Sequence, residues 1–232
     1  MSLALRTAAL ALLAATASAP AWAFSFTSSS YTTSATATAE GLTDSLADSS
    51  ATTPLPLQTL ANAAGLQDFA NATAVAEEGL LTATTYADSL AAAASAEAQV
   101  RFVGSFADGG RLRFSFDFGS DASASGGSTS GLLTVLITSS LNGSSNTLLS
   151  RSIATTGSQS FEFTLAAGSV STLDLQLLSN AATTGLGQSA QHFAQAGFAV
   201  AAVPEPGIWA LMALGLAGLA WRVRRPSGAS AA

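Results

Sequence analysis

Between residues 111 and 118 the chain alternates strictly between polar and apolar side chains. The apolar positions are Leu112, Phe114, Phe116 and Phe118, and the polar positions are Arg111, Arg113, Ser115 and Asp117. A period of two residues is typical of a β-strand that has one face in a core and the other in water. Just before it, Val100, Phe102 and Phe106 are apolar in a similar pattern, and the turn-forming residues 107–110 separate the two segments. The pattern therefore predicts a β-hairpin.

Further strands are predicted after this pair. They cover residues 132–138, 147–153, 160–165, 172–177 and 196–202. Residues 132–138 are apolar on both faces, which favours a central place in a sheet, and Asn142-Gly143 predicts the turn that follows. Short strands joined by Gly, Ser and Asn turns, with no helical segment between them, predict a mainly β fold. We expect an antiparallel, jelly-roll-like β-sandwich.

The first part of this region has a weaker pattern. Residues 31–39 alternate Thr and Ser with Ala and predict a strand of small side chains, while residues 60–78 are consistent with a helix and a loop. Residues 81–86 are rich in Thr and predict a strand. Residues 91–98 leave two interpretations open, because alanine favours a helix and a sheet also accommodates small side chains.

The first 23 residues have the layout of a secretory signal peptide. A single positive charge at Arg6 precedes an apolar stretch at residues 8–17, and small residues follow. Two A-x-A sites compete, one ending at Ala19 and one formed by Ala21 and Ala23. Pro20 would directly follow the first cut and fits a peptidase badly. We therefore predict a signal helix in residues 1–23, cleavage after Ala23, and an ectodomain at residues 24–202.

The last 30 residues combine a short motif, an apolar segment and a basic end. The motif is Val203, Pro204, Glu205 and Pro206, the uncharged segment is 207–221, and the basic residues are Arg222, Arg224 and Arg225. As a helix the uncharged segment would be roughly 22 Å long, which is short for a bilayer span. Trp209 and Trp221 near its ends, and the arginines beyond, still favour a transmembrane helix whose C-terminal end is cytoplasmic.

This order of Pro-Glu-Pro, apolar helix and terminal arginines resembles the PEP-CTERM sorting signal of Gram-negative bacteria. The resemblance covers residues 203–232, with a tail at residues 226–232 that extends past the arginines. It implies recognition by an exosortase, a membrane-embedded, cysteine-type transpeptidase-like enzyme, and processing at or near residues 204–206. Signal peptidase would be the second processing partner, and the resemblance also implies a bacterium that makes exopolysaccharide.

The composition offers little from which to build an active site. Cysteine is absent, which excludes disulfides, thiolate metal sites and cysteine nucleophiles. The single histidine, His192, has no motif around it and is predicted to lie on the surface or in a turn. No G-x-S-x-G, dinucleotide fingerprint or phosphate loop occurs. Residues 117–121 place oxygen ligands near a predicted turn but lack the acidic spacing of a calcium loop. We predict no catalytic, cofactor-binding or metal-binding residue.

The charge of the chain limits the kinds of molecule that it can bind. Only 9% of the residues are charged, lysine is absent, and the net charge is −6. Half of the basic residues lie in the two terminal segments, so the predicted ectodomain is more acidic than the chain as a whole. Nucleic acid is therefore excluded as a partner.

The leading hypothesis is an exported, non-enzymatic protein of the cell surface or extracellular matrix. Its precursor would be held transiently in the inner membrane by a single span, and an exosortase would process it. The alternative is an exopolysaccharide-binding module, although Trp22, Trp209 and Trp221 all lie outside residues 24–202 and leave only Tyr31 and Tyr86 as amphipathic aromatics. A third hypothesis is a secreted glycoside hydrolase that uses paired carboxylates. Its candidate residues are Glu97, Asp108, Asp117, Asp121 and Glu162.

Overall fold

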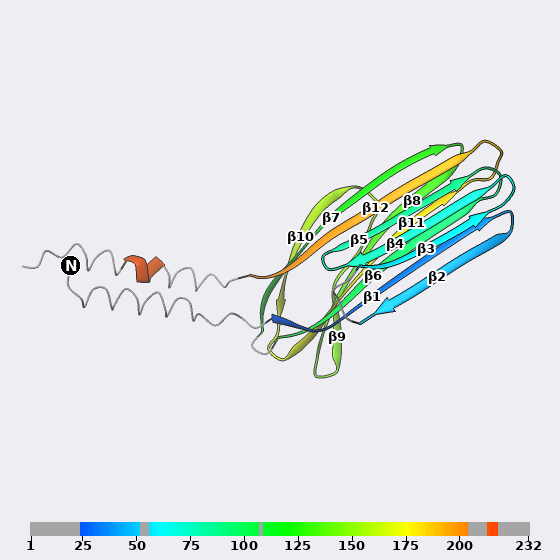
Figure 1. Cartoon of the computed structure of the whole chain (residues 1–232). Helices are drawn as coiled ribbons and strands as arrows, with labels where there is room; N and C mark the ends of the chain where they lie inside the picture. The colour runs from blue at the N-terminus through cyan, green and yellow to red at the C-terminus, as the bar shows by residue number, and fades with distance from the viewer. Residues whose placement is uncertain (1–23, 52–55, 107–108, 204–212, 218–232) are drawn as a thin grey trace, which may run out of the picture.

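The computed structural model describes residues 24–51, 56–106, 109–203 and 213–217. The first three of these ranges form a β-sandwich (Figure 1). The strands are β1 (Phe24–Ala39), β2 (Leu42–Ser50), β3 (Leu57–Ala64), β4 (Phe69–Glu77), β5 (Leu80–Asp88), β6 (Ala93–Phe106), β7 (Gly110–Ser125), β8 (Ser128–Leu141), β9 (Ser144–Ile153), β10 (Gly157–Leu165), β11 (Ser169–Ala182) and β12 (Ser189–Val203). The prediction of a mainly β, antiparallel sandwich is confirmed.

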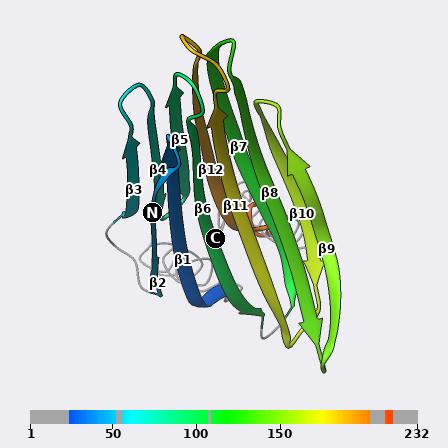
Figure 2. The same ribbon diagram turned by 90° about the vertical axis from the view of Figure 1, so that its right-hand side faces the viewer.

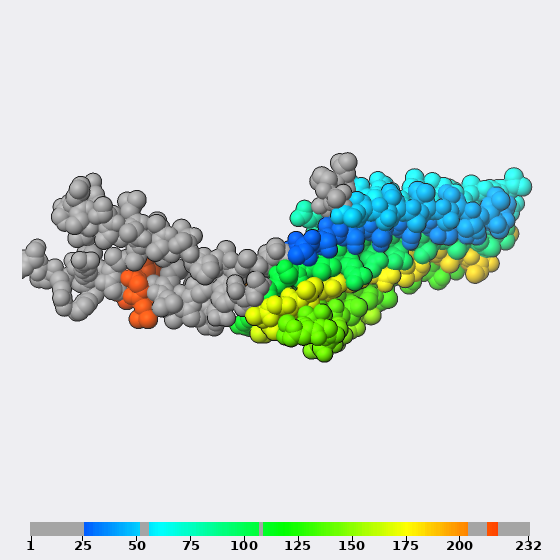
Figure 3. Space-filling model, turned by 90° about the horizontal axis from the view of Figure 1, so that it is seen from below, coloured from blue at the N-terminus to red at the C-terminus, as the bar shows by residue number. Residues whose placement is uncertain are grey.

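The strands form two six-stranded sheets. The first sheet has the order β2-β1-β6-β11-β8-β9 and the second has the order β10-β7-β12-β5-β4-β3. Figure 2 shows that the strands of both sheets are aligned along roughly the same axis. Figure 3 shows the outer face of the first sheet, on which β1, β6 and β11 lie side by side.

The core between the sheets changes character along the sandwich. Around β3, β4 and β5 most of the inward residues are alanines, such as Ala72, Ala74 and Ala83. Around β7, β8 and β11 they are large, with Phe114, Phe118 and others fully buried. Because apolar stabilisation scales with the area removed from water, most of the hydrophobic stabilisation comes from the phenylalanine-rich part.

The predicted hairpin of residues 100–118 is wrong. β6 pairs with β1 and β11 in the first sheet, whereas β7 pairs with β10 and β12 in the second, so the link between them crosses from one sheet to the other. The alternation correctly predicts each strand. It carries no information about which strand lies alongside, because a strand with one apolar face fits either sheet.

The helix expected within residues 60–78 is also wrong, because this segment forms most of β3 and all of β4. Its inward positions are alanines with a period of two residues, for example Ala61, Ala63, Ala70 and Ala72. Burial against the first sheet outweighs the helix propensity of alanine, which is worth only tenths of a kcal/mol per residue. Residues 91–98, for which two interpretations were open, lie for the most part in β6.

Several other strand predictions are confirmed. Residues 31–39 lie in β1 and residues 81–86 lie in β5. β8 lies inside the first sheet, between β11 and β9, and turns into β9 at Asn142-Gly143. Both turn residues have positive φ, 52° for Asn142 and 81° for Gly143, as a two-residue hairpin requires. Residues 160–165, 172–177 and 196–202 lie in β10, β11 and β12.

The first and last residues of the sandwich lie at the same end of it. Phe24 pairs with Phe106 at the end of β6, and Val203 pairs with Arg111 at the start of β7. We call this end the base. The opposite end, the tip, carries the turns at residues 40–41, 65–68, 89–92, 126–127 and 183–188 (Figure 1).

The predicted signal helix at residues 1–23 and most of the predicted transmembrane helix at residues 207–221 lie outside the described residues. Residues 213–217 are helical. Within the described ranges, no helix is long and apolar enough to cross a membrane.

Candidate functional site

A cluster of polar side chains lies between the two sheets, around His192. The Nδ1 atom of His192 on β12 lies 2.8 Å from Oγ of Ser179 on β11, and the Nε2 atom lies 2.9 Å from Oγ of Ser120 on β7. The Ser179 hydroxyl lies 3.0 Å from Oγ1 of Thr85 on β5. His192 is only 2% exposed, so its predicted place on the surface or in a turn is wrong. It occupies an inward position of β12, between Ala190 and Ala194.

The environment of His192 favours the neutral imidazole. Burial lowers the pKa of His192, and the negative charge of Asp121 opposes that effect to a smaller degree. The distance between Ser120 Oγ and His192 Nε2 would suit a nucleophile and its general base. The other ring nitrogen, Nδ1, however, is bound to the hydroxyl of Ser179, whereas in a hydrolase triad it is bound to a carboxylate. The cluster therefore supports a structural role, in which hydroxyl groups satisfy the ring nitrogens of a buried histidine and join the sheets.

The candidate carboxylates are spread over two different faces. Glu97 lies on the outer face of the first sheet, where Gln176 Nε2 donates to it at 2.7 Å. Asp117, Asp121 and Glu162 belong to the second sheet, and Asp108 lies outside the described residues. Asp117 and Asp121 are four residues apart along β7, which corresponds to roughly 13 Å and exceeds the separation in a glycosidase pair.

Asp117 and Glu162 already have partners. Ser158 donates to Asp117 Oδ1 at 2.7 Å, and Glu162 lies 2.6 Å from both Arg111 Nη2 and Arg113 Nη2. The hydrogen bond from Arg113 is the main cause that lowers the pKa of Glu162, and the charges of both arginines add to it. Because Glu162 is ionised and bound to two cations, it is a poor proton donor for glycoside hydrolysis.

Residues 117–121 lie inside the continuous strand β7, so the turn expected there is not present. In a strand, successive side chains point to opposite faces, and the carboxylates of this segment cannot surround one ion. Within the described residues, no group of three or more His, Asp or Glu side chains could hold a metal ion.

Three aromatic side chains lie on the outer face of the second sheet and form a diagonal row. Phe69 is on β4, Tyr86 on β5 and Phe193 on β12, three neighbouring strands of the sheet. The rings of Phe69 and Tyr86 are 5.9 Å apart, centroid to centroid. Phe69 and Phe193 are 40% and 38% exposed, although both are large apolar side chains. We call these three residues the aromatic stripe.

The strand register places polar side chains directly beside each aromatic residue of the stripe. Tyr86 pairs with Asn71 on one side and with Gln191 on the other. Phe193 pairs with Thr84 and Asp121, and Phe69 pairs with Asp88. The Asn71 Nδ2 group donates to Asn62 Oδ1 on β3, which continues the polar row. Burial, followed by the charge of Asp88 and a hydrogen bond to it, raises the pKa of Tyr86, so its phenol stays protonated.

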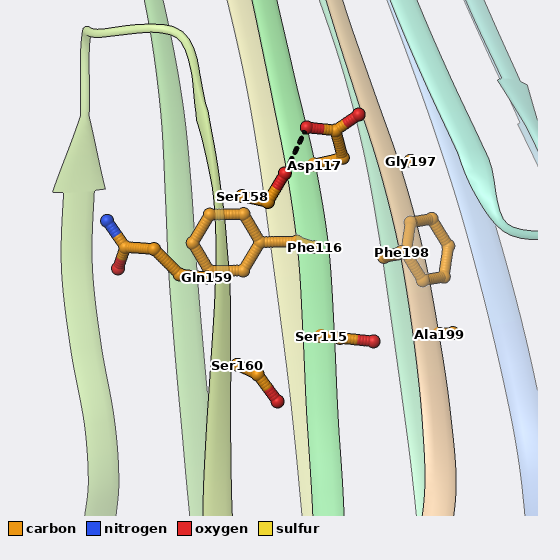
Figure 4. A pocket seen from close by; sticks show the side chains of 9 residues that line it. All are labelled: Ser115, Phe116, Asp117, Ser158, Gln159, Ser160, Gly197, Phe198 and Ala199. Carbon is orange, nitrogen blue, oxygen red and sulfur yellow. Dashed lines mark hydrogen bonds between the residues drawn. The ribbon is translucent and has the colours of Figure 1, made fainter.

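A shallow hollow of about 500 Å³ lies on the same sheet, closer to the base. It is lined by Ser115, Phe116, Asp117, Ser158, Gln159, Ser160, Gly197, Phe198 and Ala199 (Figure 4). Gly197 and Ala199 are small residues next to Asp117 and Ser115 in the register, which leaves space over β12. Figure 4 shows the hydrogen bond between Ser158 and Asp117 at one side of this hollow.

The outer face of the first sheet has a different chemistry. A hollow of about 350 Å³ there is lined by Thr32, Thr33, Ser34, Ala47, Asp48, Ser49 and Glu97. Polar side chains beside this hollow are hydrogen-bonded in a row: Thr32 donates to Gln99 at 3.2 Å, and Gln99 donates to Asp174 at 2.7 Å. These hydrogen bonds engage part of the polar groups on this face.

Two of the three stripe residues were not anticipated from the sequence. Phe69 lies within the segment predicted as a helix and a loop, and Phe193 follows the histidine predicted to lie on the surface or in a turn. Of the two tyrosines that were named, Tyr31 is buried and its ring packs edge-on against Phe102, so only Tyr86 lies on an outer face. The alternation of Phe69, Asn71 and Thr73 with buried alanines was the available signal.

The sorting segment begins where the sandwich ends. Val203 is the last residue of β12 and is half-buried. The other residues singled out for sorting, membrane orientation and signal cleavage lie outside the described residues. They are Pro204, Glu205, Pro206, Arg222, Arg224, Arg225, Ala21 and Ala23.

Comparison with solved structures yields only distant likenesses. The structure of TmCBM61 in complex with beta-1,4-galactotriose shares 9% identity, with 63% of this chain and 88% of that chain covered and a TM-score of 0.20. The structure of infectious bursal disease virus Gx strain shares 10% identity over 82% of this chain and 73% of that chain, with a TM-score of 0.19. Scores this low support no statement about fold or function. No curated protein matches the sequence.

Comparison with protein families identifies the C-terminal segment. Residues 202–225 match the family model described as the PEP-CTERM protein-sorting motif. The match runs from the last residues of β12 through Pro204, Glu205 and Pro206 to Arg225, so the resemblance stated from the sequence is confirmed. Such a motif indicates an exported protein that is sorted to the surface through processing by an exosortase. The chain is a PEP-CTERM sorting motif-containing protein.

Proposed function

We propose that the chain is a non-enzymatic protein of the cell surface or extracellular matrix, delivered there as a β-sandwich by its sorting motif. In the precursor, residues 207–221 span the inner membrane once, with the C-terminus in the cytoplasm. An exosortase then cuts at or near residues 204–206. The observation that carries the proposal is the motif at residues 202–225, which begins within the last two residues of β12.

The position of Val203 supports this route. β12 lies inside the second sheet, between β7 and β5, and Val203 is still paired with Arg111. The sorting motif therefore begins at the end of the folded domain itself. Because Phe24 and Val203 are both at the base, an anchor attached there leaves the tip as the part of the sandwich farthest from the membrane (Figure 1).

Two features of the site support a non-enzymatic role. The single histidine is enclosed between the sheets with both ring nitrogens engaged by hydroxyl groups. The candidate carboxylates within the described residues are divided between two faces or held by other side chains. Neither arrangement presents an acid and a base to one substrate.

Deleting the exosortase gene in the source bacterium tests the proposal. Mass spectrometry of the protein should show residues 207–225 removed in the parent strain and retained in the deletion strain. Retention of these residues in both strains would contradict the proposal. The same experiment identifies the N-terminus, for which Phe24 is expected after cleavage behind Ala23.

A matched pair of variants separates the motif from the rest of the tail. Replacing Pro204, Glu205 and Pro206 with alanine should prevent processing, because the recognition sequence is removed. Pro226→Ala changes a proline that follows the arginines and lies outside the matched motif, so it should be processed normally. Equal processing of both variants would show that the enzyme does not read the motif.

A further inference from the structure

We propose that the outer face of the second sheet binds a neutral polysaccharide along the aromatic stripe of Phe69, Tyr86 and Phe193. This inference rests on the function proposed above, since it assigns a ligand to the exported sandwich. Its residues differ from those of the sorting motif, so the two proposals are tested separately.

The first argument is the exposure of large aromatic rings at adjacent positions. Phe69 and Phe193 keep 40% and 38% of their surface in water on a face where polar side chains lie beside them in the register. Scattered single apolar residues on a surface need no explanation, but a contiguous row of them marks a binding surface. Diagonal neighbours on adjacent strands are about 7–8 Å apart, so the stripe is roughly 16 Å long and suits a chain rather than a single small molecule.

The second argument is the chemistry between the rings. A sugar ring has an apolar C–H face that stacks on an aromatic ring, and a rim of hydroxyl groups that need donors and acceptors. Tyr86 lies between Asn71 and Gln191 in the register, and its phenol oxygen, whose O–H group is hydrogen-bonded to Asp88, can still accept a hydrogen bond from a sugar hydroxyl. Phe193 lies between Thr84 and Asp121. Each aromatic face is thus accompanied by groups that bind hydroxyls.

The third argument is charge, which selects among polysaccharides. Asp88 and Asp121 lie in the same register rows as the stripe. The arginines on this face, Arg111 and Arg113, lie toward the base and are bound to Glu162. The carboxylates of Asp88 and Asp121 would repel an anionic polysaccharide, and the two arginines are already bound to Glu162. A neutral polysaccharide therefore fits this face better.

The fourth argument is rigidity. β4, β5 and β12 are all interior strands of the second sheet, and the residues between the stripe positions are buried alanines such as Ala70, Ala87 and Ala194. The backbone that carries the rings is therefore fixed before any ligand arrives. Binding on such a surface loses little conformational entropy. Beyond Phe193 on the same face, the hollow beside Gly197 leaves room for the chain to continue.

The experiment measures retardation of the full-length protein, purified in mild detergent, by polysaccharides embedded in a native gel. The probes are the neutral polysaccharide fraction of the source bacterium, a β-1,4-glucan, a β-1,4-galactan and, as the anionic probe, alginate. We expect at least one neutral probe to retard the protein and alginate to have no effect. The triple variant Phe69→Ala, Tyr86→Ala and Phe193→Ala should weaken the apparent affinity at least about tenfold.

A control variant alters exposed apolar residues on the other sheet. Leu136 on β8 and Val170 on β11 are exposed at 38% and 43%, close to the values for Phe69 and Phe193. The double variant Leu136→Ala and Val170→Ala should be retarded like the natural protein. Circular dichroism of all variants shows whether the fold is kept, and each single stripe variant is measured if the triple variant is unfolded.

Several results would overturn the proposal. These are no retardation of the natural protein by any neutral probe, retardation by alginate alone, or equal retardation of folded stripe variants and the control. A stripe variant that changes the sedimentation coefficient but not the retardation would show that a second copy of the chain occupies the face. None of these results affects the C-terminal processing test, and a failed processing test leaves the gel result unaltered.

Discussion

The Nδ1 atom of His192 lies 2.8 Å from Oγ of Ser179, so one hydrogen bond joins β12 of the second sheet to β11 of the first. The other ring nitrogen bonds to Ser120 within its own sheet. A serine hydroxyl can donate or accept a hydrogen bond. The hydroxyls of Ser120 and Ser179 can therefore bond to both ring nitrogens of a neutral imidazole, whichever nitrogen carries the proton. A protonated imidazole would be a buried charge with hydroxyl partners only, which is unfavourable.

This arrangement predicts that acid destabilises the sandwich. Burial lowers the pKa of His192 from its ordinary value of 6.5, and the charge of Asp121 opposes this effect. The unfolded chain then binds a proton at a higher pH than the folded chain does. The contribution of His192 to stability should be complete above about pH 6.5 and should decrease as the pH falls below that value. Urea denaturation between pH 7.5 and 5.5 measures it.

The control for this titration is His192→Gln, which keeps a polar side chain but cannot be protonated. Its unfolding free energy should be lower at pH 7.5 and should depend less on pH over the same interval. The carboxylates contribute equally to both proteins. Parallel curves for the two proteins would show that His192 does not titrate differently in the folded and unfolded states.

Gly131 on β8 packs directly against the His192 ring. A Cβ atom at this position would lie 2.2 Å from His192 Cε1, far inside contact distance. We expect Gly131→Ala to lower the unfolding free energy by about 1–3 kcal/mol, because the ring or the sheet must move. The matched change Gly119→Ala, on β7, meets no atom within 4 Å and should leave stability unchanged or slightly higher.

A double variant checks that the effect at Gly131 comes from the histidine. With His192→Ala in place, the ring that an added Cβ would strike is absent. Gly131→Ala should then cost much less than in the natural protein, a coupling that thermal unfolding of the four proteins measures. Additive effects would assign the strain at Gly131 to other neighbours.

Two phenylalanines of the second sheet should respond differently to truncation. Phe118 on β7 is completely buried, whereas Phe193 on β12 is 38% exposed. Phe118→Ala should cost about 3–5 kcal/mol through lost burial and the cavity it leaves. Phe193→Ala should change stability by no more than about 1 kcal/mol, because its role on the outer face is contact with a ligand. Chemical denaturation compares them, and equal losses would place Phe193 in the core.

Glu40 at the tip links two turns that are far apart in the sequence. Its carboxylate accepts the backbone N–H groups of Leu66 at 2.9 Å and Gln67 at 3.0 Å. Glu40→Ala should cost about 1 kcal/mol and speed amide hydrogen exchange at these two residues, because water replaces the carboxylate. Glu78→Ala removes a carboxylate from the turn between β4 and β5, away from the tip, and should leave both exchange rates unchanged. Unchanged rates in Glu40→Ala would show that the contact does not order the turn.

Alternation predicted strands well where the alternating residues were large. Residues 111–118 form part of β7 as expected, because four large apolar side chains at every second position share one face only if the segment is a strand. The prediction for residues 60–78 was wrong, and there the buried positions are alanines. Alanine is both a good helix former and an acceptable core residue in a sheet, so the pattern was ambiguous until the facing sheet was known.

The candidate site was the part least accessible from the sequence. Tyr86 could be named as an amphipathic aromatic, but its neighbours Phe69 and Phe193 come from strands that are distant in the chain. The stripe exists only in one strand register, since a shift of one residue would turn each ring to the opposite face.

The sequence alone determined the sorting motif and the periodicity of the larger strands. Both are properties of short segments, because a motif is recognised along the chain and a strand's two faces follow from its own residues. The tertiary structure decided which sheet each strand joins, the burial of His192 and the formation of the aromatic stripe. These depend on contacts such as that between Ser179 and His192, or between Phe69 and Tyr86, whose energies are set by how separate strands pair and pack.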